Sequence, residues 1–282
     1  MGIKELHFIF RSGLGCITVL LSACGGGSGP VQPALTASPV NLTCVDYAQV
    51  STNIGTLTNN VWNRQAAGSF AYSQCLTARN RNTSPQYGWS WSWPTNSGSV
   101  FSYPEVVLGW KPWNGGQTTV PSLPIRVNAI NNFSWSYAVE VHTTGIHDIA
   151  TSMWLTSNGA TSNNVDTSHL TTEFMIWSDG YAFSPAGNMV GQVGINGVNY
   201  EVWSDPNQTD ASGQNSNVWK YVAYRMTSPQ LSVTLDIKAI LNDAVSRGLV
   251  TAADYVSDIE LGTEVMSGSG NLWVDSLTLN VN

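Results

Sequence analysis

Charged side chains are scarce in this sequence: they make up 10% of its 282 residues, and the formal net charge is -7. Proteins that bind nucleic acid carry clusters of Lys and Arg that neutralise phosphate groups. This chain has only 11 Lys and Arg residues in total. We therefore expect no nucleic-acid partner.

Histidine is also rare, with four residues. His142 and His147 flank a short Thr-Thr-Gly-Ile turn, and no Cys or acidic cluster lies at metal-ligand spacing around them or around His169. The sequence has no Gly-x-Ser-x-Gly elbow, phosphate-binding loop or dinucleotide fingerprint. It therefore predicts neither a metal nor an organic cofactor, and it leaves carboxylates as the candidates for chemistry.

Long apolar runs are missing as well. The apolar stretch 13–21 follows Lys4 and Arg11 and is long enough for the core of an export signal, but too short to span a bilayer. It ends in Leu-Ser-Ala-Cys at 21–24, which resembles the lipobox of bacterial lipoproteins. That resemblance implies that Cys24 is lipidated. The alternative is an ordinary secretory signal with a chance cysteine.

These features divide the chain into three parts. We expect a lipoprotein signal peptide over 1–23, a Gly-, Ser- and Pro-rich flexible tether over 24–40 and one folded domain over 41–282. The protein would then be exported and held at the bacterial envelope by a lipid anchor, at the outer membrane or cell surface, or be secreted. The anchor would be its one contact with a membrane, and we expect a monomer.

Only two of the four cysteines remain in the folded part, because Cys16 leaves with the signal and Cys24 takes the lipid. An oxidising compartment permits a disulfide between Cys44 and Cys75, which would contribute roughly 3 kcal/mol by restricting the unfolded chain. Two free buried thiols are the alternative.

The folded part contains what suits β-structure: 12 Trp, 10 Tyr and 26 Gly, with short alternating segments broken by turn residues. One segment, 235–247, has apolar residues at helical spacing and Gly248 as a stop. The pattern predicts an all-β sandwich of two antiparallel sheets with one packed α-helix. The clearest strands are 134–142, 149–155, 172–177, 192–195, 199–203, 219–226 and 271–280.

Glutamates are few, and most sit among apolar neighbours, namely Glu105, Glu140, Glu173, Glu201 and Glu264, while Glu260 lies in a polar Asp-Ile-Glu stretch. A solvated outer-face position is the commoner explanation for any one of them. Strand alternation sets Glu173 on one face with Met175 and Trp177, a row suited to the floor of a sugar-binding cleft. Glu264 shares a face with Gly262, whose small size would let a ligand approach closely. Pattern alone does not select two glutamates.

Two short motifs contain these residues. The run Glu-Phe-Met-Ile-Trp at 173–177 resembles the nucleophile strand of glycoside hydrolase family 12, and Gly-Thr-Glu at 262–264 resembles the acid/base strand of that family. Asn-Asn-Val-Trp at 59–62 is similar to its sugar-binding Asn-Asn-x-Trp motif. The resemblance implies a β-jelly roll that cleaves β-1,4-glucans, with Asn60 and Trp62 holding a sugar. The pair Cys44 and Cys75 also fits the N-terminal disulfide of that family.

The resemblance implies a retaining double displacement, which calls for two carboxyl groups about 5 to 5.5 Å apart. Glu173 would be the nucleophile and Glu264 the acid/base, with Met175 and Trp177 as further substrate-binding residues. The sequence departs from the family at Ser152, where the family usually has an Asp that supports the nucleophile. That departure favours the alternative, a non-catalytic glycan-binding lipoprotein. The sequence does not show which of cellulose, mixed-linkage glucan and xyloglucan is the preferred substrate.

Overall fold

The structure, a computed structural model, describes residues 38–95 and 98–282. The predicted signal peptide, the lipidation site Cys24 and most of the predicted tether lie outside these residues. The described part forms two packed β-sheets with one α-helix, which confirms the predicted fold class. Within it, no helix has the length and apolar character needed to cross a bilayer.

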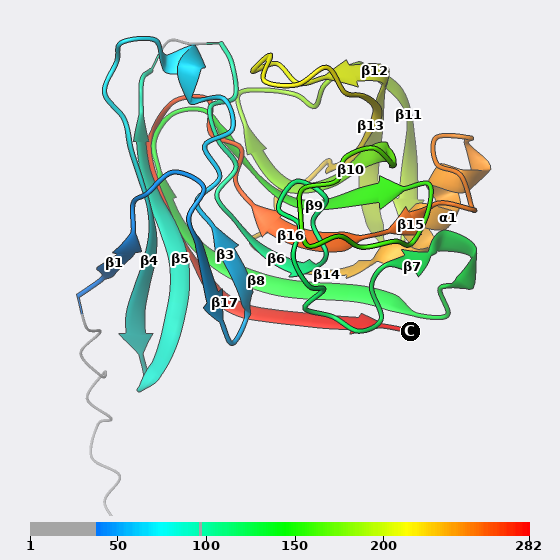
Figure 1. Ribbon diagram of the computed structural model, residues 1–282, viewed down its shortest axis with the longest axis horizontal. Coiled ribbons are helices and arrows are strands. Elements are labelled where there is room, and N and C mark those ends of the chain that lie inside the picture. Colours follow the sequence, from blue (N-terminus) through cyan, green and yellow to red (C-terminus); the bar gives the residue numbers. More distant parts are fainter. Residues whose placement is uncertain (1–37, 96–97) are drawn as a thin grey trace, which may run out of the picture. The chain divides into compact units, whose positions relative to one another are not determined.

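The first sheet has six strands in the order β1-β4-β5-β17-β8-β14. Its central strands β8 and β17 are long and strongly curved in Figure 1. The strands are β1 (Val40–Thr43), β4 (Ser73–Arg81), β5 (Ser84–Trp93), β17 (Gly268–Val281), β8 (Phe133–Thr143) and β14 (Ser232–Asp236).

The second sheet follows the order β11-β12-β13-β10-β9-β16-β6-β3-β2. Its strands are β11 (Asn188–Ile195), β12 (Val198–Thr209), β13 (Val218–Met226), β10 (Leu170–Tyr181), β9 (His147–Thr156), β16 (Asp258–Gly262), β6 (Glu105–Gly109), β3 (Gly55–Thr58) and β2 (Gln49–Thr52), with β7 (Ile125–Arg126) and β15 (Tyr255–Val256) beside them. The prediction of purely antiparallel sheets is wrong at one place, because β10 and β13 pair in parallel. Alternation does not reveal strand direction, so the sequence pattern could not show this.

Side chains alternate between the core and the second face of each sheet. Phe174 and Ile176 of β10 enter the core between the sheets, while Met175 and Trp177 lie on the other face.

The helix α1 (Ile237–Ser246) buries one apolar stripe, and the Asp236 side chain caps it by accepting a hydrogen bond from the Ala239 N–H. Short 3₁₀ helices lie at η1 (Arg64–Ala67) and η2 (Val127–Ala129). Cys44 and Cys75 form the predicted disulfide, which ties β4 to the segment after β1.

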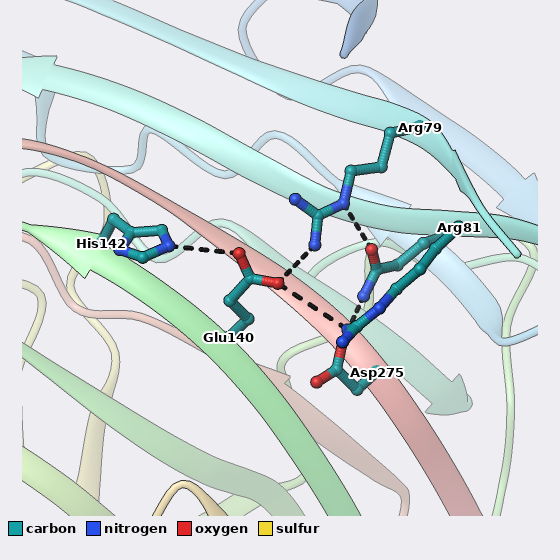
Figure 2. Close-up of polar contacts among 6 residues, drawn as sticks. Arg79, Arg81, Glu140, His142 and Asp275 are labelled. Atoms are coloured by element: carbon teal, nitrogen blue, oxygen red, sulfur yellow. Dashed lines mark hydrogen bonds and ion pairs between the residues drawn. The ribbon is translucent and has the colours of Figure 1, made fainter. Parts of the chain in front are cut away.

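The outer face of the first sheet carries a network of charged side chains (Figure 2). Glu140 on β8 forms ion pairs with Arg79 and Arg81 of β4, and Asp275 of β17 pairs with Arg81. The Arg79 guanidinium also lies over the Trp273 ring, 4.4 Å from its centroid. Glu140 is therefore a structural residue on the face opposite the core, which excludes it from the candidates for chemistry.

Candidate active site

A cleft of about 580 Å³ lies on the outer face of the second sheet. Aromatic side chains from several strands and loops line it, together with four carboxylates, Glu173, Asp210, Glu260 and Glu264. All six predicted catalytic and substrate-binding residues lie along it: Asn60, Trp62, Glu173, Met175, Trp177 and Glu264. Segments far apart in the sequence thus meet in one groove, which is large enough for a few sugar rings.

Glu173 is placed by the alternation of β10. It lies on the cleft face opposite Trp154 of β9 and Tyr221 of β13. The indole N–H of Trp219 donates a hydrogen bond of 2.8 Å to Glu173 Oε2. Burial, and then the charge of Glu264, raise the pKa of Glu173 to about 8, while the Trp219 hydrogen bond opposes that rise.

Glu264 lies two residues beyond the end of β16. Its main chain is held by Asp148 of β9, whose Oδ1 accepts a hydrogen bond of 2.7 Å from the Glu264 N–H. Burial raises the pKa of Glu264 to about 7, and the hydrogen bond from the Asp148 side chain opposes the rise. Two carboxyl groups with raised pKa values face the same cleft, so one of them can hold a proton near neutral pH while the other is ionised.

The small size of Gly262 accommodates a neighbouring side chain, which differs from the predicted reason for a glycine here. A Cβ atom at this position would lie 2.5 Å from Cζ of Tyr103. The glycine therefore makes room for the Tyr103 ring, not for a ligand, and the Tyr103 hydroxyl donates a hydrogen bond to the Ala150 carbonyl across the sheet. The prediction of close ligand approach at Gly262 is wrong for this reason.

A charge cluster with little solvent exposure lies at the base of the cleft, where Lys111 and Glu260 line it. The ammonium of Lys111 is 2.7 Å from both carboxylate oxygens of Glu105 and 2.9 Å from Oε1 of Glu260. These three side chains are at most 5% exposed. The Asn60 amide donates to Glu105 at 3.3 Å, so the cluster also orients a predicted sugar-binding residue.

Glu260 was not a candidate on sequence grounds, because its Asp-Ile-Glu context looks polar. The structure places it in the cleft lining, and the period-2 alternation of β16, which puts it on the same face as Gly262, was the signal that could have found it. Its cross-strand neighbour is Ser152, which in turn pairs with Met175. A carboxylate therefore does reach the neighbourhood of Ser152, from the adjacent strand.

The aromatic residues of the cleft differ in exposure. Trp62 is partly exposed, whereas Met175 and Trp177 are only 2% and 1% exposed and pack with Phe183 and Tyr221. A second aromatic group, which the sequence did not single out, consists of Trp113, Trp154 and Trp219 in edge-to-face contact, with ring centroids 5.4 to 5.8 Å apart. It lies beside Glu173. The role of Trp177 as a stacking surface stays a prediction.

Comparison with known proteins gives a consistent picture. The sequence model of the family described as glycosyl hydrolase family 12 matches residues 54–282. The chain is 26% identical over 226 residues to endoglucanase S of Pectobacterium parmentieri, covering 80% of this chain and 81% of that protein.

Solved structures agree with the sequence match. A native family 12 xyloglucanase from Bacillus licheniformis has a TM-score of 0.74 at 25% identity, covering 87% of this chain and all of that one. Endoglucanase cel12A from Rhodothermus marinus has a TM-score of 0.69 at 26% identity, covering 87% of this chain and 99% of the other.

Proposed function

The chain belongs to glycosyl hydrolase family 12, and we propose that it cleaves its polysaccharide by a retaining double displacement with Glu173 as nucleophile and Glu264 as acid/base. The protein is an endo-acting hydrolase of β-1,4-glucans, an endoglucanase or xyloglucanase. The alternative of a non-catalytic glycan-binding protein is not favoured. The observation that carries the mechanism is the convergence of both glutamates on one aromatic-lined cleft.

In the first step, a Glu173 carboxylate oxygen attacks the anomeric carbon while the glycosidic C–O bond breaks. Glu264 gives its proton to the departing oxygen. In the second step, Glu264 takes a proton from water, the water oxygen attacks the anomeric carbon, and the bond to Glu173 breaks. Burial raises the pKa of both groups, and it raises that of Glu173, to about 8, above that of Glu264, at about 7. This order does not distinguish an acid at position 264 from a nucleophile at position 173, so the assignment of the two roles rests on the motifs at 173–177 and 262–264.

The roles can be separated by leaving group. An aryl β-glucoside with a good leaving group needs no protonation in the first step. Glu264→Ala should therefore keep rapid release of the first aryl alcohol and lose turnover of soluble β-glucan, whereas Glu173→Ala should lose both. Glu201→Gln is the matched control, because Glu201 is a partly buried strand glutamate that pairs with Arg225 at 3.2 Å and does not line the cleft. Normal glucan turnover by Glu173→Ala and Glu264→Ala would refute the proposal.

The preferred polymer is a β-1,4-linked glucan that can lie along this cleft. Parallel assays on cellulose, mixed-linkage β-glucan and xyloglucan would rank the three. The partly exposed Trp62 supports its role as a stacking surface, with Asn60, oriented by Glu105, as the hydrogen-bonding group beside it. Trp62→Ala should raise KM for soluble glucan more than it lowers kcat.

The Cys44–Cys75 disulfide is typical of proteins outside the reducing cytoplasm, which supports export. Lipidation at Cys24, with a monomeric enzyme anchored at the bacterial envelope, is the finer form of this proposal. Metabolic labelling with a radioactive fatty acid should mark the wild-type chain and not the Cys24→Ala variant. Equal labelling of the two proteins would contradict lipidation at Cys24.

A further inference from the structure

Two glutamine side chains join segments that are distant both in the sequence and in the second sheet. The Gln214 amide, in the loop between β12 and β13, donates a hydrogen bond of 2.7 Å to the main-chain carbonyl of Trp62. The Gln65 amide of η1 donates one of 2.8 Å in the opposite direction, to the main-chain carbonyl of Ser212. The loop and the Trp62 segment thus hold each other at two points. We call this pair of contacts the glutamine bridge.

The glutamine bridge crosses the cleft. In the sheet, β13 is separated from β3, the strand that leads to Trp62, by β10, β9, β16 and β6. Neighbouring strands lie about 4.8 Å apart, so β13 and β3 are about 24 Å apart along the sheet. Figure 1 shows the β12–β13 loop, in yellow, reaching toward the short helix that follows β3. The loop and Trp62 line the same cleft as Glu173 and Glu260 of the intervening strands, so their contact passes over the cleft floor.

The tip of the β12–β13 loop is fixed from within. Asp210 Oδ1 accepts a hydrogen bond of 2.8 Å from the Ser212 N–H, and Asp210 Oδ2 accepts one of 2.7 Å from the Asn215 amide. At the base of the loop, the Asn217 amide donates to Thr167 Oγ1 at 2.8 Å. The loop therefore presents its bridging groups in one arrangement.

The bridge can nevertheless open. Both of its hydrogen bonds are exposed to water, which replaces them when they break, so each contributes little in net terms. The bridge can part when a polymer enters the cleft from above and close again over it. An endo-acting enzyme, which binds the middle of a chain, needs such an opening.

The bridge lies beside the proposed stacking surface, Trp62. The substituents of a β-glucosyl ring are equatorial, so a ring whose face stacks on an indole projects its C6 group sideways, toward the cleft walls. In an unbranched β-1,4-glucan this group is a small hydroxymethyl. In xyloglucan many of these groups carry a further sugar ring, which needs the space that the closed bridge occupies.

We propose that Gln65 and Gln214 are specificity-determining residues, which favour unbranched β-1,4-glucan chains over chains with sugar side chains. An unbranched chain binds with the glutamine bridge closed, whereas a side chain next to Trp62 keeps the bridge parted and both hydrogen bonds broken. The proposal rests on the β-glucan substrate and on the sugar-binding role of Trp62 given above.

The experiment compares kcat/KM of the full-length protein on mixed-linkage β-glucan, which is unbranched, and on xyloglucan. Without the bridge, the branched chain no longer breaks two hydrogen bonds. In the double variant Gln65→Ala, Gln214→Ala, the ratio of the xyloglucan value to the mixed-linkage value should therefore rise about tenfold. An unchanged ratio, or an equal fall on both polymers, would overturn the proposal, because the bridge would then only support the fold or Trp62.

The matched control is Gln117→Ala. Gln117 is an exposed glutamine whose amide joins two other loops by donating to Asn163 Oδ1 at 2.7 Å, and neither residue lines the cleft. This variant should keep the wild-type ratio. A rise in the ratio that the control shares would also overturn the proposal.

A second measurement does not depend on turnover. Calorimetry on the Glu173→Gln protein compares the affinity for cellotetraose with that for cellotetraose carrying xylosyl side chains. The unbranched sugar should bind about tenfold more tightly, and the difference should vanish when Gln65→Ala and Gln214→Ala are added. Equal affinities with the bridge intact would overturn the proposal. Failure of the proposed mechanism is recognised separately, as normal glucan turnover by Glu173→Ala, whatever the ratio between the polymers.

Discussion

The hydrogen bond from Trp219 to the proposed nucleophile allows a sharp test. Trp219→Phe keeps an aromatic ring in contact with Trp113 and Trp154 but removes the indole N–H that lies 2.8 Å from Glu173 Oε2. Hydrogen bonds to charged groups contribute about 1.5–3 kcal/mol, and 1.36 kcal/mol corresponds to one pKa unit. Because Trp219 lines the open cleft, we take the lower end and expect the pKa of Glu173 to rise by about one unit from its value of about 8.

The productive form has Glu173 ionised and Glu264 protonated. With pKa values of about 8 and about 7, the alkaline limb of kcat/KM reports the higher value, that of Glu173, and this limb should move to higher pH by about one unit. Below about pH 7, the fraction of enzyme in the productive form, and with it kcat/KM, should fall about tenfold. The assay is release of reducing ends from soluble β-glucan, measured from about pH 4 to 10. The matched control is Trp154→Phe, which removes an indole from the same cluster but not from Glu173. An unchanged alkaline limb in Trp219→Phe, or an equal shift in both variants, would refute the reasoning.

Three further predictions concern stability. Lys111→Met leaves Glu105 and Glu260 buried without their cation. It should therefore lower the free energy of unfolding, measured by urea titration, by about 3–5 kcal/mol. A loss of less than about 1 kcal/mol would contradict the ion-pair geometry. Burial raises the folded-state pKa values of Glu173 and Glu264 to about 8 and about 7, so their contribution is complete below the unfolded value of 4.5 and is lost as the pH rises toward 7 and 8. Stability should therefore decline over that range, and the double variant Glu173→Gln, Glu264→Gln should flatten the decline. Replacing Cys44 and Cys75 with Ala should cost about 3 kcal/mol, and an unchanged denaturation midpoint would argue against the bond.

The sequence revealed those parts of the site that depend on local alternation. Glu173 could be predicted because one acid stood on the same strand face as Met175 and Trp177, and the structure confirms that this face is the cleft floor. Glu264 could not be found in this way, because it lies beyond the end of β16, where strand alternation no longer applies. Only the ordered motifs paired it with Glu173.

The remaining site residues depend on contacts between distant segments. Lys111 meets Glu260 across 149 positions, and nothing in the local sequence of either residue indicates a buried ion pair. Trp219 and Asp148 reach the two glutamates through neighbouring strands, and the parallel pairing of β10 with β13 that brings Tyr221 beside Glu173 has no signature in alternation. Such groups become visible only when the sheet order is known.

The central claim is that Glu173 forms a covalent bond to the sugar. A glucan oligosaccharide fluorinated at C2 and carrying a good leaving group slows the second step more than the first, so the intermediate accumulates. Mass spectrometry of the digested protein should then find the glycosyl adduct on the peptide that contains Glu173. An adduct on another carboxylate, or inversion at the anomeric carbon with no adduct, would contradict the account.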